Sequence, residues 1–203
     1  MMRPRRVSWL FLLTTLALPS FASAQSLPPV SVSLCELLKD PKAYDGKQVQ
    51  VRGKISLEFE EFSIYDLRCN QSPDVWLMFG GDVATPIMSM WGDRKRIPGK
   101  NISFSGVEYT LAKDASFDEF FSHVTERENK KPLYRVTATL TGVFFSQNPK
   151  QNPKLIGVMP GYGHMGCCRL LIIEQISHVE SKRITGDDYN EKWSKRRERA
   201  TKP

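Results

Sequence analysis

The sequence lacks long continuous runs of apolar residues. Its longest apolar run, Val7 to Leu18, is shorter than the roughly 20 residues that a helix needs to span a bilayer. No later segment is long enough or apolar enough to be a transmembrane helix. This excludes a multi-span membrane protein, and we expect no transmembrane segment in the mature chain.

The N-terminal residues have the three parts of a cleavable secretory signal peptide. Three arginines precede the apolar run, which ends at Pro19, and Ala22-Ser23-Ala24 supplies the small residues that signal peptidase accepts. No cysteine follows these small residues directly, which argues against a lipid anchor. We therefore expect residues 1–24 to be removed before Gln25 and the protein to be exported, either periplasmic or secreted.

Sequence motifs of the common enzyme classes are also missing. The chain has no G-x-S-x-G elbow, no H-E-x-x-H pair and no glycine-rich phosphate loop. There are three histidines, and neither His123 nor His178 has a sequence partner that would make it a catalytic base. We expect no catalytic residues and no cofactor, with a small metal-dependent enzyme as an alternative.

The body of the chain has little net charge, because its basic and acidic residues nearly balance. Removal of the three leader arginines leaves 26 basic and 22 acidic residues, a net charge of +4, and residues 180–203 hold eight of the basic and five of the acidic ones. A nearly neutral body is a poor electrostatic match for nucleic acid. Residues 181–203 contain few apolar side chains and are predicted to form a charged C-terminal tail.

What the chain does have is strand alternation. Val49, Val51 and Ile55 alternate with polar residues, and the segment from Tyr134 is rich in β-branched residues. The predicted strands are 48–57, 62–66, 75–79, 134–145 and 170–179.

Two helices are predicted by apolar spacing and N-terminal caps. Leu34 to Lys39 follows Ser33, a suitable N-cap. Phe117 to about Asn129 follows a capping box of Ser116 and Glu119. Residues 82–100, rich in Met, Gly and Pro, are predicted to be an insertion with little regular structure.

The order of these elements is typical of the OB-fold, whose main helix lies between the third and fourth strands. The sequence thus predicts a mainly β protein: a five-stranded OB-like barrel over residues 25–180 with a short N-terminal helix. The run from Cys35 to Gly53 and the segment Gly161 to Gly166 resemble a group of uncharacterised exported bacterial proteins with OB-like domains. The resemblance implies an OB-like fold and an exported bacterial origin. It implies no particular activity, because the group has no established one.

Four cysteines in an exported chain predict disulfides. In the OB architecture that the chain resembles, the third and fifth strands are parallel neighbours. This favours a bond from Cys69 to Cys167 or Cys168, with Cys35 bonded to the other one. The alternative is Cys35 with Cys69 and Cys167 with Cys168. The cluster of His164, Cys167 and Cys168 could with Cys69 hold a soft metal, but oxidation is favoured and no metal site is predicted.

The favoured function is a non-enzymatic binding or interaction domain whose partner is an unknown envelope protein or a small ligand. OB-folds bind through the barrel face and neighbouring loops. The expected contacts are the aromatic and histidine side chains there: Phe59, Phe62, Tyr65, Trp76, Tyr162 and His164. The alternative is single-stranded nucleic acid or another polyanion held by the barrel and basic tail, which is disfavoured because the first turn is acidic.

Overall fold

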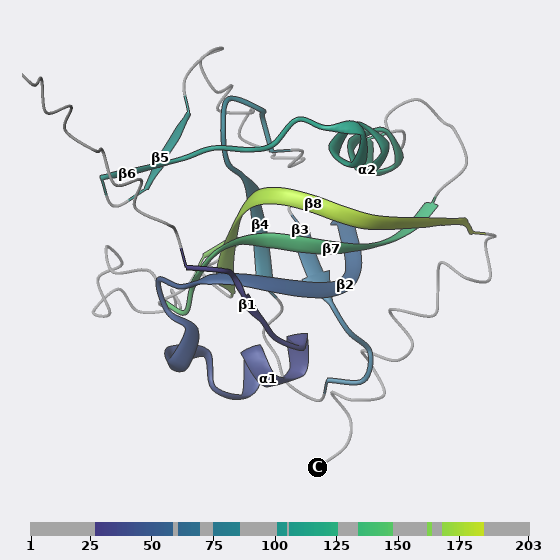
Figure 1. Cartoon of the computed structure of the whole chain (residues 1–203). Coiled ribbons are helices and arrows are strands. Elements are labelled where there is room, and N and C mark those ends of the chain that lie inside the picture. The colour runs from purple at the N-terminus through teal and green to yellow at the C-terminus, as the bar shows by residue number, and fades with distance from the viewer. Residues whose placement is uncertain are drawn as a thin grey trace, which may run out of the picture.

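Five strands close into a mixed barrel (Figure 1). They are β2 (Gln48–Glu58), β3 (Glu61–Tyr65), β4 (Val75–Phe79), β7 (Tyr134–Phe145) and β8 (Arg169–Arg183). The order around the barrel is β2, β3, β4, β8, β7, and β7 pairs with β2 to complete the ring. β4 and β8 are parallel and the other neighbours are antiparallel. The predicted fold class, an OB-like barrel, is confirmed.

The computed structural model describes residues 27–58, 61–69, 75–85, 101–104, 106–125, 134–147, 162–163 and 168–184. The expected signal peptide lies outside these residues, as do most of the 82–100 insertion and of the 181–203 tail. Over the part of the chain that is described, no helix has the length and apolar character needed to cross a membrane.

The barrel interior is a continuous apolar core with a helix on either side. α1 (Leu34–Lys39), followed by the 3-10 turn η1 (Pro41–Tyr44), contributes Leu34, Leu37 and Leu38 to this core. α2 (Ala115–Thr125) contributes Phe117, Phe120 and Val124 to the same core. In Figure 1, α2 lies above the barrel strands and α1 lies below them. The two helices therefore cover different ends of one hydrophobic interior.

The caps of the two helices differ in how well they were predicted. Ser33 is the N-cap of α1, as expected, and it also forms a reciprocal capping box with Glu36 that was not predicted. The cap predicted at Ser116 is wrong, because α2 begins at Ala115, two residues before the expected start at Phe117. Asp114 takes the capping role: its carboxylate accepts a hydrogen bond from the Phe117 N–H at 3.0 Å.

Three short strands were not predicted. β1 (Val30–Ser31) pairs in parallel with β2. β5 (Ile102–Phe104) and β6 (Val107–Tyr109) form a separate antiparallel hairpin joined at Gly106. These strands are two or three residues long, too short for alternation to be visible in the sequence.

β8 is longer than its apolar pattern indicated. The strand was expected to end near Val179 and the domain at residue 180, but pairing with β7 continues to Arg183 opposite Tyr134. The strand therefore extends past residue 180, because backbone hydrogen bonds to β7 continue where apolar side chains stop. Within this stretch a register shift places His178 at a φ of 48° and forms a bulge. The division into a domain and a charged tail stays a prediction.

Asp114→Ala is expected to lower the free energy of unfolding by about 1 kcal/mol, because it removes the hydrogen bond that caps α2. Ser116→Ala is the matched control and is expected to have a much smaller effect. Urea denaturation of both variants measures the difference. Equal losses in the two variants would contradict the assignment of the cap.

Candidate functional site

Of the six residues expected to bind a ligand, four are among the described residues, and three of these four are buried. Phe62 lies inside the barrel with 0 % exposure and packs against Phe79, with ring centroids 5.5 Å apart. Trp76 and Tyr162 are 7 % and 8 % exposed and belong to a second apolar cluster. Tyr65 is half-buried at the end of β3. Phe59 and His164 lie outside the described residues.

This second cluster lies on the outer side of β4 and β8. Val75, Leu77 and Phe79 point into the barrel, whereas Trp76 and Met78 belong to the outer cluster. The outer cluster is completed by residues from the β5–β6 hairpin, from the end of β7 and from the segment before β8: Ile102, Phe104, Tyr109, Val143, Phe145, Tyr162 and Cys168. The outer side of β4, one of the two strands whose face OB-folds use for ligands, is thus covered by the chain itself.

Tyr162 anchors one part of this cover. Its backbone exchanges two hydrogen bonds with Cys168, with N to O distances of 2.6 and 3.0 Å, and its hydroxyl donates to the Gln147 carbonyl at 2.9 Å. Burial raises the pKa of the Tyr162 phenol to about 12. The following residue, Gly163, has a φ of 73° and lies so close to Trp76 that a Cβ there would be 2.3 Å from the indole ring. The segment therefore requires glycine at this position.

The favoured disulfide pairing is wrong. Cys69 is bonded to Cys35, with a Cα separation of 5.0 Å, as in the alternative pairing. β4 and β8 are parallel neighbours as expected, but Cys69 lies in the turn that follows β3, on the side of the barrel covered by α1. Cys168 is also disulfide-bonded. Its possible bond to Cys167 stays a prediction, because Cys167 lies outside the described residues.

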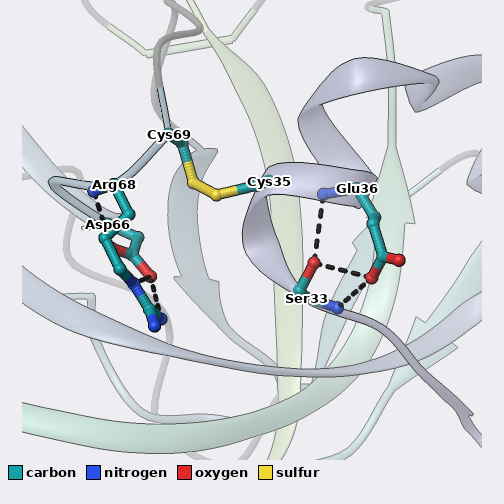
Figure 2. Close-up of polar contacts among 6 residues, drawn as sticks. All are labelled: Ser33, Cys35, Glu36, Asp66, Arg68 and Cys69. Carbon is teal, nitrogen blue, oxygen red and sulfur yellow. Dashed lines mark hydrogen bonds and ion pairs between the residues drawn. A yellow bond between two sulfur atoms is a disulfide. The ribbon is translucent and has the colours of Figure 1, made fainter.

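Two local structures hold the Cys35–Cys69 bond (Figure 2). On one side, the capping box fixes the first turn of α1: Ser33 N–H and Oγ donate to Glu36 Oε2 at 3.1 and 2.6 Å, and Glu36 N–H donates to Ser33 Oγ at 3.2 Å. The Ser33 hydrogen bonds hold the pKa of Glu36 below its usual value. Cys35 is therefore presented by a helix turn with its own hydrogen bonds.

On the other side, a tight turn presents Cys69. The Cys69 N–H donates to the Asp66 carbonyl at 3.1 Å, and the Arg68 N–H donates to Asp66 Oδ1 at 2.9 Å. The Arg68 guanidinium adds bonds to both carboxylate oxygens, the shortest at 2.7 Å. These bonds lower the pKa of Asp66. The turn places Asp66 and Cys69 at its two ends, so a carboxylate and a sulfur lie together.

The Asp66 carboxylate and the two sulfurs form one group of donor atoms. One atom from each of Cys35, Asp66 and Cys69 lies within 4.8 Å of the other two. Cys69 is 4 % exposed, whereas Cys35 is half-buried. No sequence motif joins Cys35 to this group, although the D-x-x-C spacing of Asp66 and Cys69 fits a four-residue turn.

A row of polar side chains crosses the outer side of β2, β7 and β8. Gln48 donates to Glu174 at 2.8 Å, and Gln50 donates to Thr141 at 3.4 Å. Arg52 contacts Thr139 Oγ1, the His178 carbonyl and Glu180 Oε1 at 3.3, 2.9 and 2.7 Å. We call these seven residues the polar row: Gln48, Gln50, Arg52, Thr139, Thr141, Glu174 and Glu180. Their side chains are ordered by contacts with one another before any ligand binds.

His123 and Ser181 form a contact that resembles part of a catalytic pair. Their Nε2 and Oγ atoms are 3.1 Å apart, and the His123 ring lies against Tyr134. A catalytic serine needs a histidine that is oriented by a third group on Nδ1. His123 Nδ1 is buried without a hydrogen-bond partner. The contact therefore joins α2 to β8 and lacks the geometry of an activated nucleophile.

Gly163→Ala is expected to destabilise the protein by more than Gly106→Ala. Both glycines have a positive φ, but only at Gly163 would the added Cβ meet a ring, whereas Gly106 has nothing within 4 Å. The difference between the variants isolates the contact with Trp76, and chemical denaturation measures it. An equal loss of unfolding free energy in the two variants would show that the segment around Gly163 does not pack on Trp76.

The Tyr162 phenol is expected to ionise near pH 12 in the folded protein. Since the ordinary pKa is 10.0, the folded state favours the neutral phenol, and the stability that this contributes is lost as the pH rises from 10 to about 12. Ultraviolet titration should show a late-ionising phenol that is missing in Tyr162→Phe. An unchanged late phase in that variant would assign it to another tyrosine.

Comparison of the chain with protein-family models, with curated proteins and with solved structures finds no match. The resemblance to exported bacterial OB-like proteins therefore stays a prediction, and the fold and the geometry of these sites carry the functional argument.

Proposed function

We propose that this protein is an exported, non-enzymatic binding domain that takes a neutral, hydroxyl-rich ligand, such as a glycan chain, on the polar row. The observation that carries the proposal is the set of hydrogen bonds that joins Gln48 to Glu174, Gln50 to Thr141, and Arg52 to Glu180. Binding costs about 0.5–1.5 kcal/mol for each flexible side chain that must be ordered. In the polar row the cost of ordering side chains is lower, because these side chains already hold one another through hydrogen bonds before a ligand binds.

The chemistry of the polar row suits hydroxyl groups. Amides, threonine hydroxyls, a guanidinium and carboxylates provide both donors and acceptors within one surface. The charge of Arg52 is balanced by Glu180, and Glu174 adds a negative charge beside Gln48. A phosphate backbone would meet carboxylates here, so this surface favours a neutral ligand over a nucleic acid. That OB-folds bind oligosaccharides is an analogy at the level of the fold.

Part of the polar row has the exposure that a ligand requires. The Arg52 and Glu180 side chains are 39 % and 73 % exposed, and Gln48, Gln50 and Glu174 are half-buried. Thr139 and Thr141 are buried, at 9 % and 6 % exposure, and support the row from below. β2, β7 and β8 run side by side in Figure 1, between α2 above and α1 below. A chain-like ligand could lie across these three strands.

The test is retention of the mature protein on immobilised neutral glycan, compared with immobilised heparin and single-stranded DNA. Gln50→Ala/Arg52→Ala is expected to weaken glycan binding about tenfold or more, equivalent to about 1.4 kcal/mol. Gln147→Ala/Arg183→Ala removes the same residue types outside the polar row and should leave binding unchanged. Melting temperatures should change little in either variant, because exposed ion pairs contribute about 0–1 kcal/mol.

Retention on heparin or DNA alone, falling steeply with salt, would contradict this proposal and favour polyanion binding. Deletion of residues 184–203 would then show whether the basic tail is responsible. Equal losses in the two double variants would exclude the polar row as the binding surface.

A further inference from the structure

We propose that reduction of the Cys35–Cys69 disulfide creates a binding site for a zinc-like divalent cation, with Cys35, Cys69 and Asp66 as its ligands. The site lies on the α1 side of the barrel and is independent of the polar row. Thiolate sulfur and carboxylate oxygen are zinc ligands, and sites with three protein ligands leave a fourth position for water.

The three ligand atoms are already close together. They lie within 4.8 Å of one another, whereas donors bound tetrahedrally at about 2.0–2.3 Å lie roughly 3.3–3.8 Å apart, so modest side-chain rotations are needed. After reduction the sulfurs move apart from their bonded separation, and a small rotation brings the carboxylate closer. The Cα separation of 5.0 Å between the cysteines requires no rearrangement of the backbone.

The ligands remain in place without the disulfide because each is held by local hydrogen bonds. Cys35 belongs to a helix turn fixed by the Ser33–Glu36 capping box, and Leu34 beside it is buried in the core. Asp66 and Cys69 belong to the turn closed by the Cys69 N–H and the Arg68 N–H. In Figure 2 the hydrogen bonds between Ser33 and Glu36 and between Asp66 and Arg68 do not involve the sulfur atoms.

The chemical steps balance with a dithiol reductant. The reductant gives two electrons and two protons, the S–S bond breaks, Cys35 and Cys69 become thiols, and the reductant becomes a disulfide. The divalent ion then displaces the two thiol protons and binds the two thiolates. The oxidised Cys35–Cys69 pair has no thiolate to offer, so metal binding at this site occurs in the reduced state alone.

Arg68 competes with the metal for Asp66. Its guanidinium binds both carboxylate oxygens, and its side chain is 87 % exposed, so it can move into solvent. Removing Arg68 should therefore strengthen metal binding. If Arg68 served only to stabilise the turn, the same substitution would weaken it.

The test is titration of the mature protein with Co²⁺, a spectroscopic substitute for Zn²⁺, before and after reduction by a phosphine that leaves no competing thiol in solution. The reduced protein is expected to bind one ion with thiolate-to-metal absorption, and the oxidised protein is not. Asp66→Asn should weaken binding tenfold or more. The control Asp82→Asn, which alters a carboxylate paired with Lys113 elsewhere, should have no effect, and Arg68→Ala should tighten binding severalfold.

The cysteines that bind the metal are identified in the unmodified chain, so the result does not depend on a variant that folds poorly. Zn²⁺ is expected to protect Cys35 and Cys69 of the reduced protein from alkylation, as mapped by mass spectrometry. Protection confined to Cys167 and Cys168, metal binding of equal strength by the oxidised protein, or weaker binding by Arg68→Ala would each overturn the proposal.

Discussion

The parallel pairing of β4 with β8 is the constraint on which the rest of the structure depends. It joins Val75 to Arg169 and Phe79 to Ile173, segments far apart in the sequence, and it closes the barrel. β4 and the first residues of β8 are apolar on both sides, because Trp76 and Leu170 point outward while Leu77 and Leu171 point inward. Strands of this kind are stable only when both faces are covered.

The second apolar cluster follows from this constraint. The β5–β6 hairpin and the segment that contains Tyr162 cover the outer side of β4 and β8. As a result, the outer side of β4, one of the strands whose face an OB-fold offers to a ligand, is part of an apolar core. Across β2, the middle of β7 and the second half of β8 the outward residues are polar, and Arg52 and Glu180 among them are exposed, so the barrel has one apolar outer side and one polar outer side.

The sequence predicted the barrel strands because each carries a strong local pattern, and it predicted the short α1 because Ser33 and the buried leucines act locally. It did not predict that the outer side of β4 is covered, although the uninterrupted apolar runs of β4 (VWLMF) and β8 (LLII) are typical of strands that are buried on both sides. Recognising this would have placed Trp76 in a core. The disulfide was predicted incorrectly because Cys69 was expected near the start of the third strand, beside the fifth, whereas the turn that follows β3 fixes its position beside α1. The polar row depends on register across three strands, which one sequence does not specify.

The Cys35–Cys69 bond also has a mechanical consequence. Before Cys35 the N-terminal segment is joined to the barrel by the two-residue strand β1 and a hydrogen bond from the Val32 N–H to the Gln50 carbonyl. A pulling force on the N-terminus would first break these few bonds, as in unzipping. At Cys35 the load would then pass through a covalent bond to the end of β3, and further peeling of α1 from the barrel would stop. The oxidised protein thus has a fixed point of attachment only a few residues inside its described N-terminal end.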